Sequence, residues 1–206
     1  MKKIELFLYK LLLQFYRLND SIPASCDAIA VHGYELTRGD ELSDATRQGV
    51  ERAIKFARQF PSAQMFLISA ILRGPEKKAT EDRLKWEMLQ KAGLENRAVL
   101  TAIGAKDTGD EAQIISWFLG DTPKDLLVIC DADQMRCARI IWRHFRPNDR
   151  LHLLGFEGRW DKEHICFFQR NPLVWLAVNF FRHTLLLAFG VSGTGKVTKF
   201  LKAIKT

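Results

Sequence analysis

LLVICDADQMRCARIIWRHF, residues 126–145, shows the strand-to-helix unit from which the fold is built. Residues 126–131 are apolar almost without interruption, as in a strand that is buried on both faces of a sheet. The apolar residues that follow recur at helical spacing, which predicts a helix over 133–145. A strand and a helix joined in this way are typical of a parallel sheet with helices on both sides.

The same alternation recurs along the chain. Further strands are predicted at 26–33, 63–69, 98–103 and 151–156, and further helices at 43–59, 80–92 and 109–119. Ser43 or Asp44 can cap the first of these helices and Thr80 the second, while Gly93 suits a left-handed C-cap. Strands that alternate with helices are joined by right-handed crossovers. We therefore predict a Rossmann-like three-layer α/β/α sandwich with a mainly parallel sheet of about five strands.

The length of 206 residues fits a single domain, and we find no internal repeat and no linker. Apolar residues make up 47% and charged residues 27%, which is typical of a soluble globular protein. We divide the domain into an N-terminal amphipathic helix (1–20), an α/β core (26–160), an apolar C-terminal helix (171–190) and a basic tail (191–206).

Two apolar runs bear on the location of the protein. Polar residues interrupt the run near the N-terminus and no small-residue cleavage site follows it, so we expect no cleavable signal peptide. The run at 171–191 carries Arg182 near its middle, and a central arginine costs about 2.5 kcal/mol or more on insertion. We interpret this run as a largely buried helix, with a membrane segment as the alternative.

The cysteines show no metal-like spacing and suit a reducing cytosol. We predict a cytoplasmic protein, with membrane association as the alternative.

The stretch GVSGTGKV, residues 190–197, has the spacing of a phosphate-binding loop at Gly190, Gly195 and Lys196. Val197 stands where such a loop needs a hydroxyl group for magnesium, and no predicted strand follows. We interpret the stretch as a hinge that leads into a basic tail. The tail forms either a frayed solvated end, which we favour, or a short amphipathic helix on an anionic membrane or a partner. Its lysines recur every three residues: Lys196, Lys199, Lys202 and Lys205.

Ligands of an open parallel sheet bind beyond the carboxyl ends of its strands. Carboxylates dominate the residues predicted at this edge: Asp107, Asp110, Glu111, Asp131 and Asp133. Asp131 and Asp133 are able to share a divalent metal, but we favour helix capping by these two and a dipole interaction for Asp110 and Glu111. For His32, which follows the first strand, we favour a structural role over acid–base chemistry. The net charge of +7 favours anionic partners, and we do not expect nucleic acid among them.

Several short motifs occur in order between about residue 26 and residue 190. They are CDAIAVHGY (26–34), Leu42-Ser43, LISA (67–70), TEDRLKWEMLQKAGL (80–94), DTGDEA (107–112), CDADQMRCA (130–138) and NPLVWLAVNFF (171–181). In order and spacing they resemble the motifs of the YdcF/SanA/ElyC family, long classed as a domain of unknown function. The chain departs from that family at Asp131, Gln134 and Cys137, which stand in place of a serine, a histidine and an arginine. It also keeps only Ser69 of a Ser-Gly-Gly sequence.

The missing histidine and arginine remove a proton shuttle and a clamp for phosphate-type groups, although Arg136 or Arg139 could replace the arginine. The resemblance implies a ligand site at the carboxyl edge of the sheet and a link to cell-envelope biogenesis. The residues expected to bind the ligand are Gly33, Tyr34, Ser69, Glu81, Thr108, Gln134, Arg136 and Arg139.

Three functions remain open. The first is binding of a small anionic or nucleotide-like ligand, with S-adenosylmethionine among the candidates. The second is a metal-assisted hydrolase or transferase that acts on a phosphorylated or glycan-linked substrate. Its candidate catalytic residues are Asp131, Asp133, Asp110 and Glu111. The third is a noncatalytic protein that acts through partner or membrane contacts. The missing histidine and arginine favour the first and the third.

Overall fold

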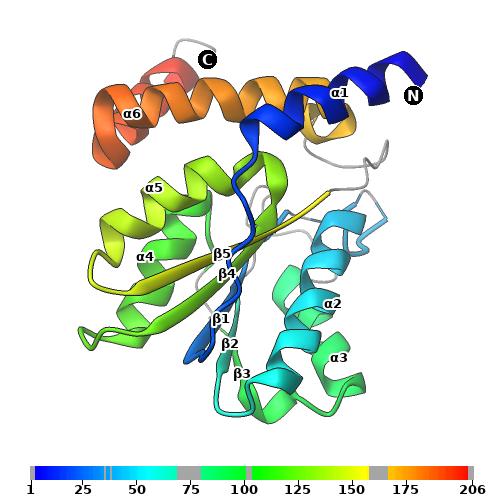
Figure 1. Ribbon diagram of the computed structural model, residues 1–206, viewed down its shortest axis with the longest axis vertical. Helices are drawn as coiled ribbons and strands as arrows, with labels where there is room; N and C mark the ends of the chain where they lie inside the picture. Colours follow the sequence, from blue (N-terminus) through cyan, green and yellow to red (C-terminus); the bar gives the residue numbers. More distant parts are fainter. Residues whose placement is uncertain are drawn as a thin grey trace.

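The computed structural model describes residues 3–34, 36–37, 39–68, 80–100, 104–157 and 167–203. Its strands are β1 (Ala28–Val31), β2 (Gln64–Leu67), β3 (Ala98–Leu100), β4 (Asp125–Asp131) and β5 (Arg150–Phe156). They form one sheet in the order β3-β2-β1-β4-β5, and every neighbouring pair is parallel (Figure 1). The predicted parallel sheet of about five strands is confirmed.

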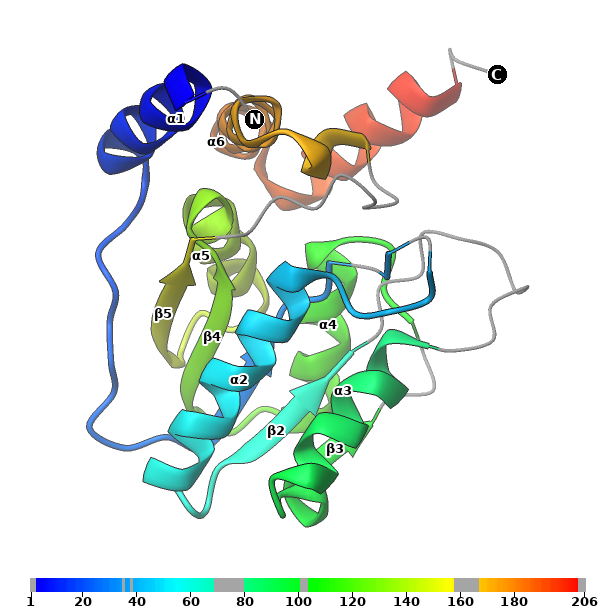
Figure 2. The same cartoon turned by 90° about the vertical axis from the view of Figure 1, so that its right-hand side faces the viewer.

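Helices cover both faces of this sheet, as predicted. One face packs against α2 (Asp44–Gln59) and α3 (Glu81–Lys91), and the other against α4 (Thr108–Leu119) and α5 (Met135–Phe145) (Figure 2). In β1 the side chains alternate between the two cores, so that Ile29 faces α2 and Ala30 faces the opposite layer. Both faces are buried, which explains the near-continuous apolar runs of the strands.

Most of the predicted helix ends are confirmed. The Ser43 side chain accepts a hydrogen bond from the Thr46 N–H over 3.3 Å, and Gly93 has a φ of 69° at the end of α3. Thr80 occupies the N-cap position of α3 without a side-chain cap bond. The helix predicted over 133–145 instead begins at Met135, after a 3₁₀ turn, η2 (Ala132–Gln134). Two further 3₁₀ turns are η1 (Glu95–Arg97) and η3 (Phe167–Arg170).

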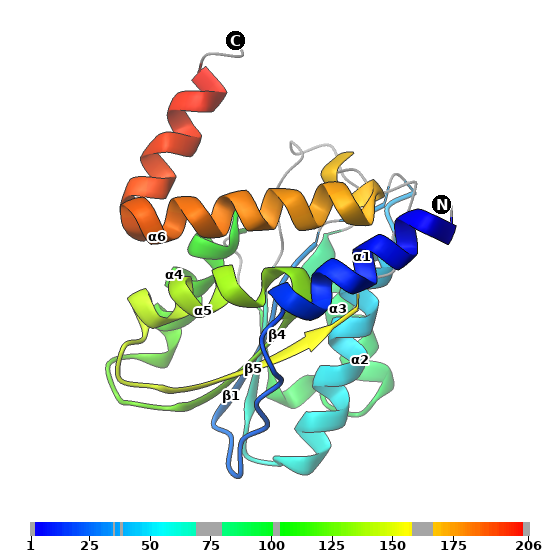
Figure 3. The same ribbon diagram turned by 45° about the horizontal axis from the view of Figure 1, so that its top comes forward.

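Two further helices, α1 (Lys3–Tyr16) and α6 (Pro172–Ala203), lie side by side across the carboxyl edge of the sheet (Figures 2 and 3). Tyr9, Leu13 and Tyr16 on one face of α1 are buried in a cluster with Leu176 of α6 and Ala132 of η2. The edge at which such sheets bind ligands is therefore roofed by the first and last helices of the described chain.

The expectation that the apolar C-terminal helix is largely buried is wrong. Within Pro172–Thr194, only 22% of the most apolar window is buried, because just one face of the helix meets the domain. By length and composition this segment would be able to cross a membrane, although a core helix of a soluble protein can pass the same test.

The tail also differs from the favoured prediction of a frayed end. Gly190, predicted to begin a hinge, has φ 67° and ψ −177° and breaks the regular geometry of α6. This conformation suits glycine alone. The backbone then returns to a helix as far as Ala203, and Figure 3 shows this second segment turning away from the first.

Candidate functional site

A small cavity lies where the strand order reverses. The chain leaves β1 toward β2 on one side and β4 toward β5 on the other, so the loops after β1 and β4 diverge at this point. The cavity has a volume of about 140 Å³. Five predicted site residues line it: Gly33, Tyr34, Thr108, Glu111 and Gln134. Six residues that were not predicted as ligand-binding or catalytic complete the lining: Ala105, Lys106, Asp107, Gln169, Trp175 and Arg182.

Gly33 brings two buried carboxyl groups together at the end of β1. Its N–H donates to Glu111 Oε1 over 2.7 Å, and the N–H of Tyr34 donates to Glu81 Oε1 over 3.0 Å. A Cβ atom at position 33 would lie 2.8 Å from Glu81 Oε2 and 3.1 Å from Glu111 Oε1. The close approach of these side chains to the backbone therefore requires a glycine.

Lys85 of α3 lies beneath this pair of carboxyl groups. Its Nζ lies 3.3 Å from Glu81 Oε1 and donates to the Ile68 carbonyl over 2.8 Å. Burial raises the pKa of Glu111 to about 8, although the charge of Lys85 and the N–H of Gly33 act in the opposite direction. Glu111 is therefore mainly protonated at neutral pH, and it is able to give up or take a proton near pH 8.

A chain of hydrogen bonds leads from the cavity into the core. Tyr34 donates its hydroxyl proton to Gln134 Oε1 over 3.1 Å and accepts the N–H of Asp131. The Trp142 indole donates to His32 Nε2 over 3.1 Å, which leaves Nδ1 of the neutral ring to donate to Gln134 Oε1 over 3.4 Å. Burial lowers the pKa of His32 to about 4. The geometry favours the structural role expected for this histidine.

Asp131 and Asp133 tie the two roof helices to the end of β4. Trp175 of α6 donates its indole N–H to Asp131 Oδ2 over 3.2 Å, and the Tyr9 hydroxyl of α1 lies 3.3 Å from Asp133 Oδ1. Asp131 also accepts the N–H of Asp133 and so caps η2, as the favoured interpretation expects. Burial raises the pKa of both carboxyl groups, and the charge of Asp131 raises that of Asp133 further. In the described part of the chain, no three His, Cys, Asp or Glu side chains are grouped so as to hold a metal.

The N-terminus of α4 forms another wall of the cavity. Asp107 is its N-cap and accepts the N–H groups of Gly109 and Asp110, over 2.7 and 3.1 Å. Arg182 reaches in from α6, with Nη1 3.4 Å from Thr108 Oγ1. Asp107 thus accepts two of the free N–H groups of the helix, and Arg182 and Lys106 place positive charge on this wall.

The structure places the other predicted site residues outside the cavity. Asp110 lies beside it and accepts the N–H of Lys106 over 3.0 Å. Arg136 stacks on the Tyr16 ring, 5.4 Å from its centroid, and donates to the Tyr16 carbonyl, so it holds α1 in place. Arg139 is exposed on α5. Ser69 lies outside the described residues.

Two of the cavity residues that sequence reasoning missed, Trp175 and Arg182, come from α6. Trp175, Asn179 and Arg182 recur at helical spacing and share the face that meets the sheet edge. Asn179 is buried and donates to the Trp175 carbonyl over 3.0 Å. The polar residues within an otherwise apolar run were therefore the available signal, because they mark the side of the helix that meets polar partners.

Comparisons of the chain with protein-family models, with curated proteins and with solved structures found no match. The resemblance to the YdcF/SanA/ElyC family therefore stays a prediction.

Proposed function

We propose that this chain is a divergent YdcF/SanA/ElyC-like protein that binds a small anionic ligand in the cavity between the ends of β1 and β4. The observation that carries the proposal is the approach of Arg182 to Thr108 in the lining of the cavity at the strand-order reversal. Sheets of this type bind their ligands at that point. The family likeness would connect such a ligand with cell-envelope biogenesis.

The charges around the cavity favour an anion. Arg182 and Lys106 supply two positive charges, and Asp107 is engaged in capping α4. Glu111 adds little negative charge at neutral pH, because its pKa is raised to about 8 by burial. An anionic group would therefore meet two cations, the capping carboxylate of Asp107 and a mainly neutral carboxylic acid.

The size of the cavity limits the part of a ligand that it holds. Pockets that enclose a drug-sized ligand have volumes of about 300–1,000 Å³. The described cavity, at about 140 Å³, accommodates a phosphate- or carboxylate-sized group. A nucleotide or S-adenosylmethionine would have to extend beyond it.

A thermal-shift screen tests the proposal, with inorganic phosphate, sugar phosphates, nucleotides and S-adenosylmethionine, each with and without a divalent metal. A ligand at 100 times its dissociation constant adds about 2.7 kcal/mol to stability, which is a measurable shift. We expect Arg182→Gln to abolish the shift. Arg139→Gln, which removes an exposed arginine of α5, should leave it unchanged.

Two outcomes would contradict this assignment. If no anion shifts the transition of the wild-type protein, the cavity is not an anion site. If the shift survives Arg182→Gln but disappears in Lys196→Ala, the ligand binds at the GVSGTGKV stretch instead. The transition of each variant without ligand shows whether the substitution has disturbed the docking of α6.

One observation favours a catalytic alternative. A buried acid with a pKa near 8 beside a cavity is what acid–base catalysis needs at neutral pH, and Glu111 fits that description. The substrate would be the phosphorylated or glycan-linked compound of the second hypothesis. Turnover of a phosphate ester that disappears in Glu111→Gln, while ligand binding persists, would establish this alternative.

A further inference from the structure

The outer face of α1 is apolar and largely exposed in the described structure. Its exposed side chains recur at helical spacing: Ile4, Phe7, Leu8, Leu11, Leu12 and Phe15. The opposite face, with Tyr9, Leu13 and Tyr16, is already packed on the domain. The helix thus carries two apolar faces, of which the fold uses one.

The first segment of α6 continues this apolar surface. Phe180, Phe181 and Leu187 are exposed on it, and the hydroxyl between them, on Thr184, donates to the Phe180 carbonyl over 3.1 Å. That hydroxyl therefore already has a partner within the helix, as apolar surroundings require. Of the fourteen large apolar side chains exposed in the described part of the chain, ten lie on α1 and α6.

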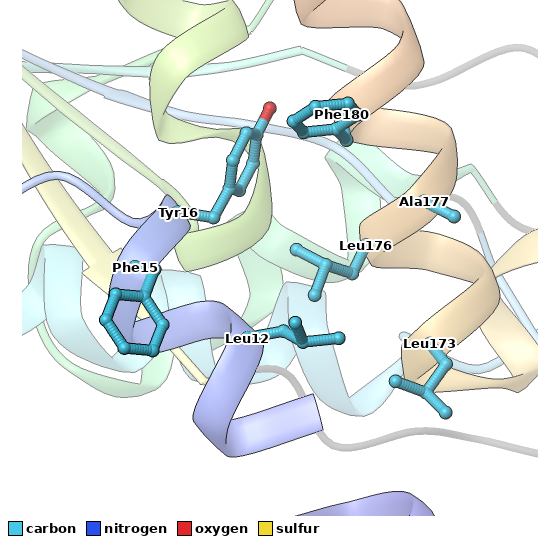
Figure 4. A pocket seen from close by; sticks show the side chains of 7 residues that line it. All are labelled: Leu12, Phe15, Tyr16, Leu173, Leu176, Ala177 and Phe180. Carbon is cyan, nitrogen blue, oxygen red and sulfur yellow. The ribbon is translucent and has the colours of Figure 1, made fainter. Parts of the chain in front are cut away.

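An apolar groove of about 390 Å³ runs between the two helices (Figure 4). Leu12 of α1 faces Leu176 of α6 across it, and the Tyr16 ring lies 5.8 Å from the Phe180 ring. The hydroxyl of Tyr16, which also lines the groove, donates to the Asn179 carbonyl over 3.0 Å. The groove thus offers hydrocarbon-lined space and no charged side chain.

Lysine residues outnumber acidic residues on the same two helices. Apart from Arg182, which lies at the cavity, α1 and α6 carry five Lys residues and a single acidic residue, Glu5, in a chain of net charge +7. A second copy of this surface would bring like charges together. Anionic headgroups would complement them, and Lys side chains can extend to the headgroups while their stems stay on apolar surface.

We propose that α1 and the first segment of α6 lie flat in the surface of an anionic lipid bilayer, with lipid hydrocarbon filling the groove between them. Amphipathic helices with an apolar face and cationic residues bind membranes in this way. The inner face of α6 keeps it parallel to the sheet edge, since Trp175 bonds to Asp131 and Arg182 to Thr108. The surface is separate from the anion cavity and does not depend on the proposed function.

Co-sedimentation of the full chain with phosphatidylcholine vesicles, with and without phosphatidylglycerol, tests the proposal. We expect stronger binding to the anionic vesicles, and weaker binding as salt screens the charges. Phe15→Gln and Phe181→Gln, at side chains 78% and 57% exposed, should each weaken binding about tenfold, the effect of losing one buried aromatic side chain. Trp117→Gln is the matched control, because Trp117 is 74% exposed on α4, away from this surface.

The proposal fails if the wild-type protein does not sediment with anionic vesicles, or if Phe15→Gln and Phe181→Gln bind as well as Trp117→Gln. It also fails if the wild-type protein is a dimer that Phe181→Gln dissociates and that does not bind vesicles, since a second copy would then cover the surface. Circular dichroism melting of each variant shows that the substitutions leave the fold intact.

Discussion

The indole N–H of Trp175 donates a hydrogen bond to Asp131 Oδ2 over 3.2 Å, and this bond joins α6 to the carboxyl end of strand β4. Asp131 is buried, so this carboxyl group depends on donors within the protein. The contact fixes the position from which α6 presents Arg182 to the cavity.

Trp175→Phe should lower the free energy of unfolding by about 1–3 kcal/mol, because it leaves a buried carboxyl oxygen without its indole donor. Urea unfolding at neutral pH measures the effect. Trp117→Phe is the control, since that indole is exposed on α4, and we expect a change within about 0.5 kcal/mol. Equal effects of the two substitutions would show that the bond to Asp131 contributes nothing.

The protein should lose stability as the pH rises from 6.5 toward 8. Folded Glu111 keeps its proton up to a pKa of about 8, whereas the unfolded chain releases it near 4.5, so the unfolded state binds fewer protons in between. His32 acts in the opposite direction, because its pKa is lowered to about 4, but its effect ends near its ordinary value of 6.5. Above that value only the buried carboxyl groups remain, and Asp131 and Asp133 have the same sign as Glu111.

Glu111→Gln should reduce this slope by about 1 kcal/mol per pH unit, the contribution of one titrating group. Its amide oxygen can still accept the N–H of Gly33. The measurement is the free energy of urea unfolding at several pH values between 6.5 and 8 for both proteins. Identical slopes would mean that Glu111 ionises in the folded state as it does in water.

Gly33→Ala should destabilise the protein by about 1–3 kcal/mol, because the new methyl group would lie 2.8 Å from Glu81 Oε2 and 3.1 Å from Glu111 Oε1. Gly39→Ala is the matched control, since the nearest atom to a Cβ atom there, Thr37 Oγ1, is 3.8 Å away. Thermal unfolding distinguishes the two. Tolerance of alanine at position 33 would show that the carboxyl groups can move apart without loss.

Lys85→Met should cost about 3–5 kcal/mol, because it leaves the buried carboxylate of Glu81 without its compensating charge. The same helix supplies the control. Arg83 and Glu87 form an ion pair with the same i,i+4 spacing over 3.5 Å, but both are exposed, so Arg83→Met should cost about 0.5 kcal/mol or less. Chemical denaturation of both variants measures the difference, and equal losses would contradict the buried pairing.

The sheet was predictable because apolar runs such as 126–131 can be buried only between two helical layers. Part of the cavity lining was predictable once the sheet was, since Gly33, Thr108 and Gln134 all follow the carboxyl ends of parallel strands. What the sequence could not supply was the docking of α6. Helical spacing shows that Trp175 and Arg182 share a face, but it does not identify the element that this face meets.

The exposure of α6 was misjudged for a related reason. An apolar composition is compatible with burial in a core and with contact with lipid, and only the packing of the other elements distinguishes the two. Arg136 was similarly misplaced. Its position on α5 was predicted, but its stacking on Tyr16 depends on where α1 lies, which no local pattern encodes.

The walls of the cavity come from distant parts of the chain, from Gly33 after the first strand to Arg182 within the last helix. During synthesis the five strands leave the ribosome before α6, so a nascent chain can pair its sheet while the binding site is still incomplete. Trp175 and Arg182 can close it only after α6 has also been synthesised. Ligand binding would thus distinguish chains that include α6 from chains truncated before it, even where a truncated chain retains the whole sheet.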